Sequence, residues 1–222
     1  MLLTSVNICD QVLQTHNTAF SCLKRFTVFS IHGTETKEGK LGFRIYKTGF
    51  SCAAEYLDKD AKDTAKIVGL SAIKYGDLSN QATKDYIFDV YRFTSFEGNT
   101  GPYILYTIVR IKSILNRYVQ EGGDLSTGKI LPAVNASEKN LMLQLSGFAA
   151  MVENAFEEKA PHKICAYIYE VSNAFNSFYH ETKILSEEDQ AQKESFLQLL
   201  QLTRRVLETS IDLLGFSAPD RM

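Results

Sequence analysis

Two tyrosines and two arginines recur at helical spacing directly after a polar loop with two glycines, "SFEGNTGP" (residues 95–102). One face of a helix predicted to begin near Pro102 carries, approximately, Tyr103, Tyr106 or Thr107, Arg110, Ile114 and Arg117. Aromatic rings interleaved with guanidinium groups are suited to stacking unpaired bases and neutralising their phosphates. The same stripe also fits the amphipathic rim of a protein core, so the pattern alone leaves both interpretations open.

Amphipathic helices are expected to position this face. One helix is predicted from Pro102 to Gly122, one from an N-cap at Ser137 to Glu158, one from Pro161 to Leu185, and one from an N-cap at Ser186 to Leu214. Four long helices with short links predict a mainly α fold, an antiparallel helical bundle. The residues predicted to be buried are Ile104, Leu105, Ile108, Ile111 and Leu115 in the first helix, and Leu197, Leu200, Leu207, Ile211 and Leu214 in the last.

The part before the bundle is predicted to be a small mixed α/β segment. Apolar clusters at 26–31 and 41–46 flank a charged turn, which is typical of a hairpin. A helix is expected from Glu55 to about Gly76, followed by an extended connection with a strand or turn at "DYIFDV" (85–90). We therefore divide the chain into a segment 1–60, a junction 61–101 and a bundle 102–222.

Composition and residue patterns exclude some classes of protein. The 222 residues are 45% hydrophobic and 23% charged with a formal charge of −2, which indicates a folded protein and excludes a surface that is basic throughout. No apolar run approaches the ~20 residues that cross a bilayer, and no signal peptide is recognised, so we expect a cytoplasmic protein without membrane contact. His162 and His180 lack a partner acid at suggestive spacing, and the cysteines, expected to be reduced, lack a metal-binding pattern: Cys9, Cys22, Cys52 and Cys165.

Three blocks in order carry a resemblance to a known family: "AIKYGDLSNQATKDYIFDVYRFTSFEGNTGPYILYTIVRIKSIL" (72–115), "SNAFNSFYHETKIL" (172–185) and the terminal "LLGFSAPDRM". They resemble bacterial arginyl-tRNA synthetases, from the junction with the catalytic core through the anticodon-binding helical domain. The likeness covers about residues 64–222. It implies a class I aminoacyl-tRNA synthetase, an arginine-tRNA ligase that activates arginine with ATP and transfers it to tRNA.

The resemblance also implies roles for individual residues. Tyr103, Tyr106 and Arg110 would contact the anticodon arm of arginine tRNA, with the loop 95–100 beside it. A base pocket would be lined by Asn173, Phe178 and Tyr179, and the chain end, Arg221 and Met222, would fold back onto that pocket. A monomer is expected.

The amino-terminal part departs from the family. Residues 1–60 contain no match to the family's HIGH-type adenine-binding signature or its arginine pocket, and only "ETKEGKLGFRI" (35–45) is faintly similar to the nucleotide-gripping region. We therefore expect no cofactor in this chain, ATP being the cofactor of the full-length family, and no arginine activation or tRNA charging by this polypeptide alone. A catalytic domain missing from this chain would then be an expected partner.

Two alternatives stay open. The chain could be a truncated, non-catalytic helical module that binds tRNA or a protein partner. In that case a large exposed apolar patch is expected around residues 75–93, where the catalytic domain would have packed. It could also be a fragment with a foreign amino-terminal segment.

Overall fold

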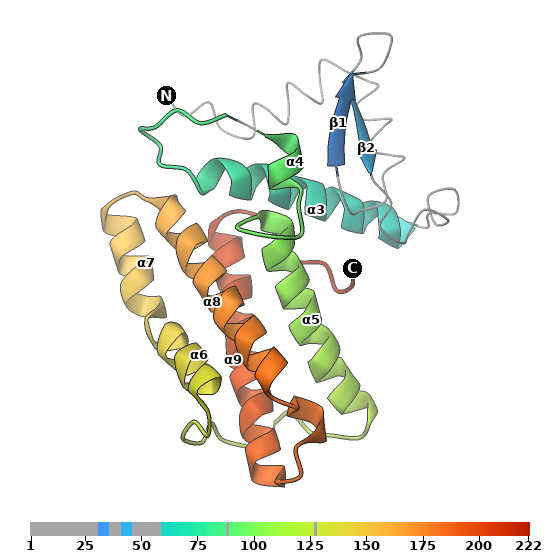
Figure 1. The fold of residues 1–222 in the computed structure, drawn as a ribbon, viewed down its shortest axis with the longest axis vertical. Helices are drawn as coiled ribbons and strands as arrows, with labels where there is room; N and C mark the ends of the chain where they lie inside the picture. Colours follow the sequence, from blue (N-terminus) through green and yellow to red (C-terminus); the bar gives the residue numbers. More distant parts are fainter. Residues whose placement is uncertain (1–30, 36–40, 46–58, 88, 127) are drawn as a thin grey trace. The chain divides into compact units, whose positions relative to one another are not determined.

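The computed structural model describes residues 31–35, 41–45, 59–87, 89–126 and 128–222 (Figure 1). Contacts within the chain group these residues into two compact units. The first extends to Leu105 and includes Met222, and the second comprises Tyr106–Arg221. The boundary falls inside helix α5 (Gly101–Gln120).

The first unit contains a two-stranded antiparallel sheet. Strand β1 (Ile31–Glu35) pairs with β2 (Leu41–Ile45), with Ile31 opposite Ile45. The second predicted strand is confirmed. The other predicted cluster, residues 26–31, overlaps strand β1 only at Ile31, where that strand begins. Residues 26–30 lie outside the described residues.

Helix α3 (Lys59–Leu78) follows the predicted helical pattern and continues two residues beyond Gly76. Its buried residues recur at helical spacing, as Ala65, Val68, Ala72 and Tyr75. Gly76 lies inside the helix where the Phe93 ring packs against it, and a Cβ at this position would lie 2.9 Å from that ring.

A short helix, α4 (Val90–Phe93), follows the position where a strand or turn was predicted. Residues 85–87 form neither the strand nor the turn that was predicted within the extended connection, and Phe88 lies outside the described residues. Asp89 is the N-cap of α4: its Oδ1 accepts hydrogen bonds from the backbone N–H groups of Tyr91 (2.9 Å) and Arg92 (3.3 Å). A local side-chain cap here favours helical geometry over an extended chain.

The loop before α5 fixes the start of that helix. Gly98 has a φ of 80°, which favours glycine, and Thr100 Oγ1 accepts a hydrogen bond from the Tyr103 N–H at 3.2 Å. A Cβ at Gly101 would lie 2.4 Å from the carbonyl oxygen of Ser71, so only glycine lets α5 approach α3 this closely. The expected compact loop attached to a helix start is confirmed.

The second unit is a bundle of antiparallel helices. It contains most of α5, then α6 (Ala136–Ser146), α7 (Phe148–Glu157), α8 (Pro161–Glu181), a 3₁₀ turn at Ile184–Ser186, and α9 (Gln190–Leu213). Figure 1 shows α5 and α8 running in one direction and α6, α7 and α9 in the other. The mainly helical fold is confirmed, and every residue predicted to be buried in the first and last helices is at most 4% exposed.

Four predicted boundaries in the bundle are wrong. Helix α8 ends at Glu181 and not at Leu185, which belongs to the 3₁₀ turn that follows. The predicted helix 137–158 is two helices that meet at Gly147. Its N-cap is Asn135, whose Oδ1 accepts a hydrogen bond from the Glu138 N–H at 2.7 Å, whereas Ser137 lies inside the first turn. Helix α9 is capped by Asp189, because Ser186 belongs to the preceding 3₁₀ turn. Short polar side chains compete for the cap position, and spacing alone does not rank them.

A buried carboxylate completes the start of α6. Glu138 is fully buried, and its Oε2 accepts a hydrogen bond from the Val134 N–H at 2.8 Å. Burial raises the pKa of Glu138, and hydrogen bonds from the backbone of Val134 and Asn135 oppose that rise. A carboxyl group with a raised pKa in the folded state stabilises the fold most below its unfolded pKa, and this contribution is lost as the pH rises through the folded pKa.

Replacing Glu138 tests this balance. The free energy of unfolding of wild type minus that of Glu138→Gln should fall as the pH rises above the ordinary pKa of a glutamate side chain, because glutamine keeps an acceptor without a charge. Glu138→Ala should cost about 1 to 3 kcal/mol by removing the acceptor of a partly buried N–H. Urea unfolding across this pH range measures both, and a difference that rises with pH would contradict the assigned direction.

Candidate nucleic-acid interface

The guanidinium of Arg110 lies at the centre of a group of polar and aromatic side chains from α5 and α8. It donates to Asn176 Oδ1 at 3.0 Å and to the Tyr106 hydroxyl at 2.9 Å. Its Cζ atom lies 4.6 Å from the centre of the Tyr106 ring and 5.3 Å from that of Tyr179. We refer to Tyr106, Arg110, Asn176 and Tyr179 as the Arg110 cluster.

Helical spacing explains why these four side chains meet. Tyr106 and Arg110 are four residues apart on α5, and Asn176 and Tyr179 are three apart on α8, so each pair shares a helix face. The Tyr179 ring stacks on the buried Phe175 ring, with centres 6.0 Å apart and planes inclined by 27°. Phe175 therefore anchors Tyr179 to the core and fixes the orientation of its ring.

The arrangement suits recognition of a single-stranded nucleic acid. Tyr106 is 41% exposed and Tyr179 38%, so both rings retain accessible area for contact with a base. The guanidinium has five N–H donors, and the described side chains use two of them, so others can contact a phosphate. Cation–π contact and two hydrogen bonds hold the group in place before any ligand binds.

Phe178 is a correction to the predicted site. Its side chain is 0% exposed, and its ring packs edge-on against Phe196 of α9, with centres 5.4 Å apart. It faces α9 and not the surface that carries Tyr179, because adjacent residues on a helix point about 100° apart. The prediction that Phe178 lines a base pocket is therefore wrong.

The other predicted residues lie outside the Arg110 cluster. Asn173 is half-buried on α8, one turn before Asn176, and Tyr103 is half-buried in the first turn of α5. The exposed Arg221 ends the second unit, and Met222 is grouped with the first. Arg117, which shares the sequence stripe, is 71% exposed and pairs with Glu121 at 2.9 Å.

Asn176 is the cluster residue that the sequence prediction missed. The prediction selected Asn173 from the same block, "SNAFNSFYH", although Asn176 lies one turn closer to Tyr179. The spacing of three residues between Asn176 and Tyr179 was an available signal. Spacing within α8 could not reveal Arg110 as the partner, because Arg110 is 66 residues away in sequence.

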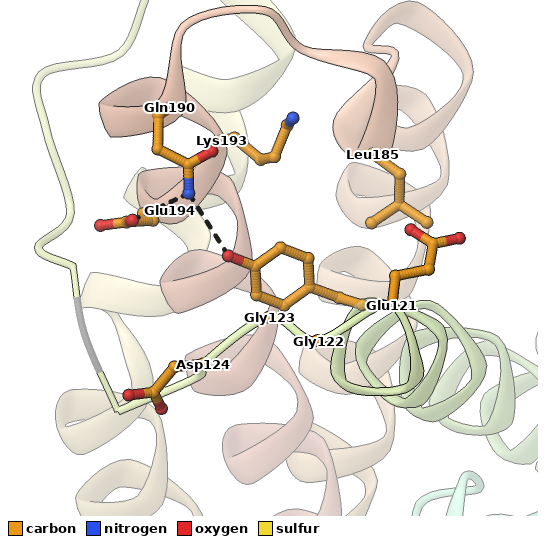
Figure 2. Close-up of a pocket in the computed structure, with 9 residues that line it drawn as sticks. Glu121, Gly122, Gly123, Asp124, Leu185, Gln190, Lys193 and Glu194 are labelled. Atoms are coloured by element: carbon orange, nitrogen blue, oxygen red, sulfur yellow. Dashed lines mark hydrogen bonds between the residues drawn. The ribbon is translucent and has the colours of Figure 1, made fainter.

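A pocket of about 390 Å³ lies elsewhere in the bundle, at the carboxyl end of α5 and the amino end of α9 (Figure 2). Its lining carries three carboxylates, of Glu121, Asp124 and Glu194, and one ammonium group, of Lys193. This charge balance disfavours a polyanion, so the pocket is a poor candidate for contact with nucleic acid.

The described residues give little support for a metal site, a cysteine nucleophile or a membrane-spanning helix. Their His, Cys, Asp and Glu side chains form no group of three that could hold a metal ion. Cys165 is buried, and burial raises the pKa of its thiol to about 12, so the thiol is a weak nucleophile at neutral pH. The other three cysteines lie outside the described residues. No helix in the described part of the chain has the length and apolar content to cross a bilayer.

Comparison with known proteins places the bundle in a family. Residues 104–222 match the family described as the DALR anticodon binding domain. The chain belongs to this family. The DALR domain thus accounts for α5 to α9, the helices that carry the Arg110 cluster.

Similar proteins are longer than this chain. The chain is 68% identical over 167 residues to an arginine-tRNA ligase of Agathobacter rectalis and 53% identical over 163 residues to one of Alkaliphilus oremlandii. These matches cover 74% and 73% of this chain, which spans about 28% of the length of either relative.

The similar solved structures are also arginyl-tRNA synthetases. An arginyl-tRNA synthetase of Thermus thermophilus is similar with a TM-score of 0.66 and 31% identity, over 78% of this chain and 30% of that one. The arginyl-tRNA synthetase of Plasmodium falciparum has a TM-score of 0.66 and 27% identity, over 74% of this chain and 29% of that one. The predicted resemblance to arginyl-tRNA synthetases is confirmed.

Proposed function

We propose that the DALR domain of this chain binds the anticodon arm of arginine tRNA, with the Arg110 cluster contacting unpaired bases and phosphates of the loop. The observation that carries this proposal is the Arg110 guanidinium within cation–π distance of two partly exposed tyrosine rings. Stacking on aromatic rings captures splayed bases, and a fixed cation contributes favourable electrostatic energy along the RNA backbone.

The domain would act as the tRNA-holding part of ATP-dependent arginine-tRNA ligation. Forming an aminoacyl-adenylate requires the amino-acid carboxylate, the α-phosphate and positive charge to be preorganised together. The Arg110 cluster supplies RNA contacts and no such arrangement. We therefore propose that this polypeptide contributes tRNA binding, and that arginine activation and transfer require the rest of a full-length ligase.

The alternative of a protein-docking module receives less support. It requires an extended apolar patch around residues 75–93, of which Phe88 lies outside the described residues, and Tyr75 and Phe93 at the two ends of this stretch are 0% and 6% exposed. Ile87 and Tyr91 are exposed there, at 92% and 55%. Single exposed apolar side chains are common on protein surfaces and do not by themselves indicate a partner.

A salt titration tests the proposed function. The chain should bind a fluorescent anticodon-arm hairpin of arginine tRNA, and the association constant should fall as salt rises from about 50 to about 200 mM because bound phosphates release counterions. With one or two arginine–phosphate contacts, the slope of log K against log salt should be roughly −1 to −2. Fluorescence anisotropy measures the series.

The acceptor-arm hairpin of the same tRNA is the matched control, since it has a similar charge but no anticodon loop. It should bind more weakly at every salt concentration. Equal binding of both hairpins would reduce the interaction to general electrostatics and contradict the proposed function.

A further inference from the structure

The chain reverses direction after α9. Gly215 has a φ of 79°, its N–H donates to the Asp212 carbonyl at 2.8 Å, and the Phe216 N–H donates to the Ile211 carbonyl at 3.1 Å. These two bonds form the Schellman motif that commonly ends helices at glycine. Phe216 is 5% exposed, so its burial fixes the start of the C-terminal tail (residues 215–221).

Lys112 of α5 holds the other end of this tail. Its Nζ lies 3.2 Å from Glu208 Oε1, 3.2 Å from the Pro219 carbonyl oxygen and 3.3 Å from Asp220 Oδ1. An ammonium group has three donors, and these acceptors can use all of them. The Lys112 side chain is only 12% exposed, and a lysine is seldom this buried unless it is paired.

Glu208 is itself oriented by a second cation. Its other carboxylate oxygen, Oε2, accepts a hydrogen bond from Arg204 Nε at 3.0 Å. Each oxygen of the Glu208 carboxylate therefore contacts one cation. Lys112 contacts both Glu208 of α9 and the tail, and so it connects the two. The tail acceptors are 107 and 108 residues away from Lys112 in sequence, so this contact exists only in the folded bundle.

The tail and the Arg110 cluster lie on opposite flanks of α5. At about 100° per residue, Lys112 and Arg110 point about 160° apart around the helix axis. Tyr106 and the exposed Ser113 lie between them, on the side away from the core. The exposed Arg221 directly follows the two tail residues that Lys112 holds.

We propose that Lys112 is a positioning residue for RNA binding, which holds the tail so that Arg221 contacts a phosphate of the anticodon arm from the flank of α5 opposite the Arg110 cluster. The RNA loop would then span the exposed side of α5 between the two contacts. This inference rests on the proposed function. Lys112 itself does not contact RNA, since its donors are directed at protein acceptors.

A double-mutant cycle tests the inference. Wild type, Arg221→Ala, Lys112→Met and the double variant are titrated with the fluorescent anticodon-arm hairpin, at a temperature below the unfolding transition of each protein. Arg221→Ala should weaken binding about five- to tenfold in the wild-type background and less than about twofold in the Lys112→Met background. Lys112→Arg, which keeps a cation beside Glu208, should restore most of the Arg221 effect.

The outcomes separate a positioning role from a structural one. If Lys112 only stabilises the bundle, Lys112→Met lowers the melting temperature, yet Arg221→Ala costs the same factor in both backgrounds, and the inference is overturned. Binding by Lys112→Met at wild-type strength also overturns it. In both cases wild type still binds the hairpin and the proposed function stands. Failure of wild type to bind the hairpin overturns both.

Discussion

Arg110→Ala should weaken binding of the anticodon arm by about 2 to 3 kcal/mol, which is roughly 30- to 150-fold in the dissociation constant. The substitution removes the cation that would contact a phosphate. It also removes the group that bonds the Tyr106 hydroxyl and lies near both rings of the Arg110 cluster. Tyr106 loses a hydrogen bond that orients its ring, and Tyr179 loses a cation–π contact, so base stacking weakens when the electrostatic attraction is lost. Fluorescence anisotropy with the hairpin measures the change.

Two further variants make this result specific. Arg110→Lys keeps the charge but lacks the planar fork that bonds two partners and stacks on rings, so it should recover less than half of the lost binding energy. Arg117→Ala removes an equal charge from the same helix, at a site paired with Glu121 outside the Arg110 cluster. It should change the dissociation constant less than about threefold. Equal losses for Arg110→Ala and Arg117→Ala would show that only net charge matters.

Phe178→Ala should lower the free energy of unfolding by about 3 to 5 kcal/mol, because it deletes a fully buried ring that packs against Phe196. The neighbouring Tyr179→Ala should cost about 1 kcal/mol of stability or less, since its ring is partly exposed and its main packing partner is Phe175. Urea unfolding followed by circular dichroism measures both values.

The binding of the same two variants should show the reverse order. Tyr179→Ala is expected to weaken hairpin binding by about 1 to 3 kcal/mol, the cost of one lost stacked base. Phe178→Ala, measured at a temperature where it remains folded, should bind the hairpin within about threefold of wild type. Normal stability together with lost binding in Phe178→Ala would return this residue to the binding surface and contradict its placement in the core.

Periodicity predicted the parts of the fold that have one dominant apolar face. The stripes of α5 and α9 were identified because each helix buries one side. Helix α8 contacts α6, α7 and α9, and it reaches α5 through Asn176, so apolar residues point in several directions. Spacing could not decide which of the adjacent residues Phe178 and Tyr179 faced the core.

Other features depend on contacts that no local pattern reveals. The break at Gly147 was missed because a single glycine inside an apolar pattern is compatible with a continuous helix. The contact of Lys112 with the tail requires both the reversal at Gly215 and the packing of α5 beside α9. The resemblance to the family indicated that Arg221 belongs to the site, but not which residue holds the tail in place.

The most direct test of the Arg110 cluster as an RNA-binding surface is NMR of the chain with isotope-labelled tyrosine rings, titrated with the anticodon-arm hairpin. The ring signals of Tyr106 and Tyr179 should shift progressively and saturate together. The signal of Tyr167, whose hydroxyl donates to the Gln144 carbonyl at 3.0 Å on the side of α8 that faces α6, should stay unchanged. Shifts at Tyr167 with none at Tyr106 and Tyr179 would contradict the account.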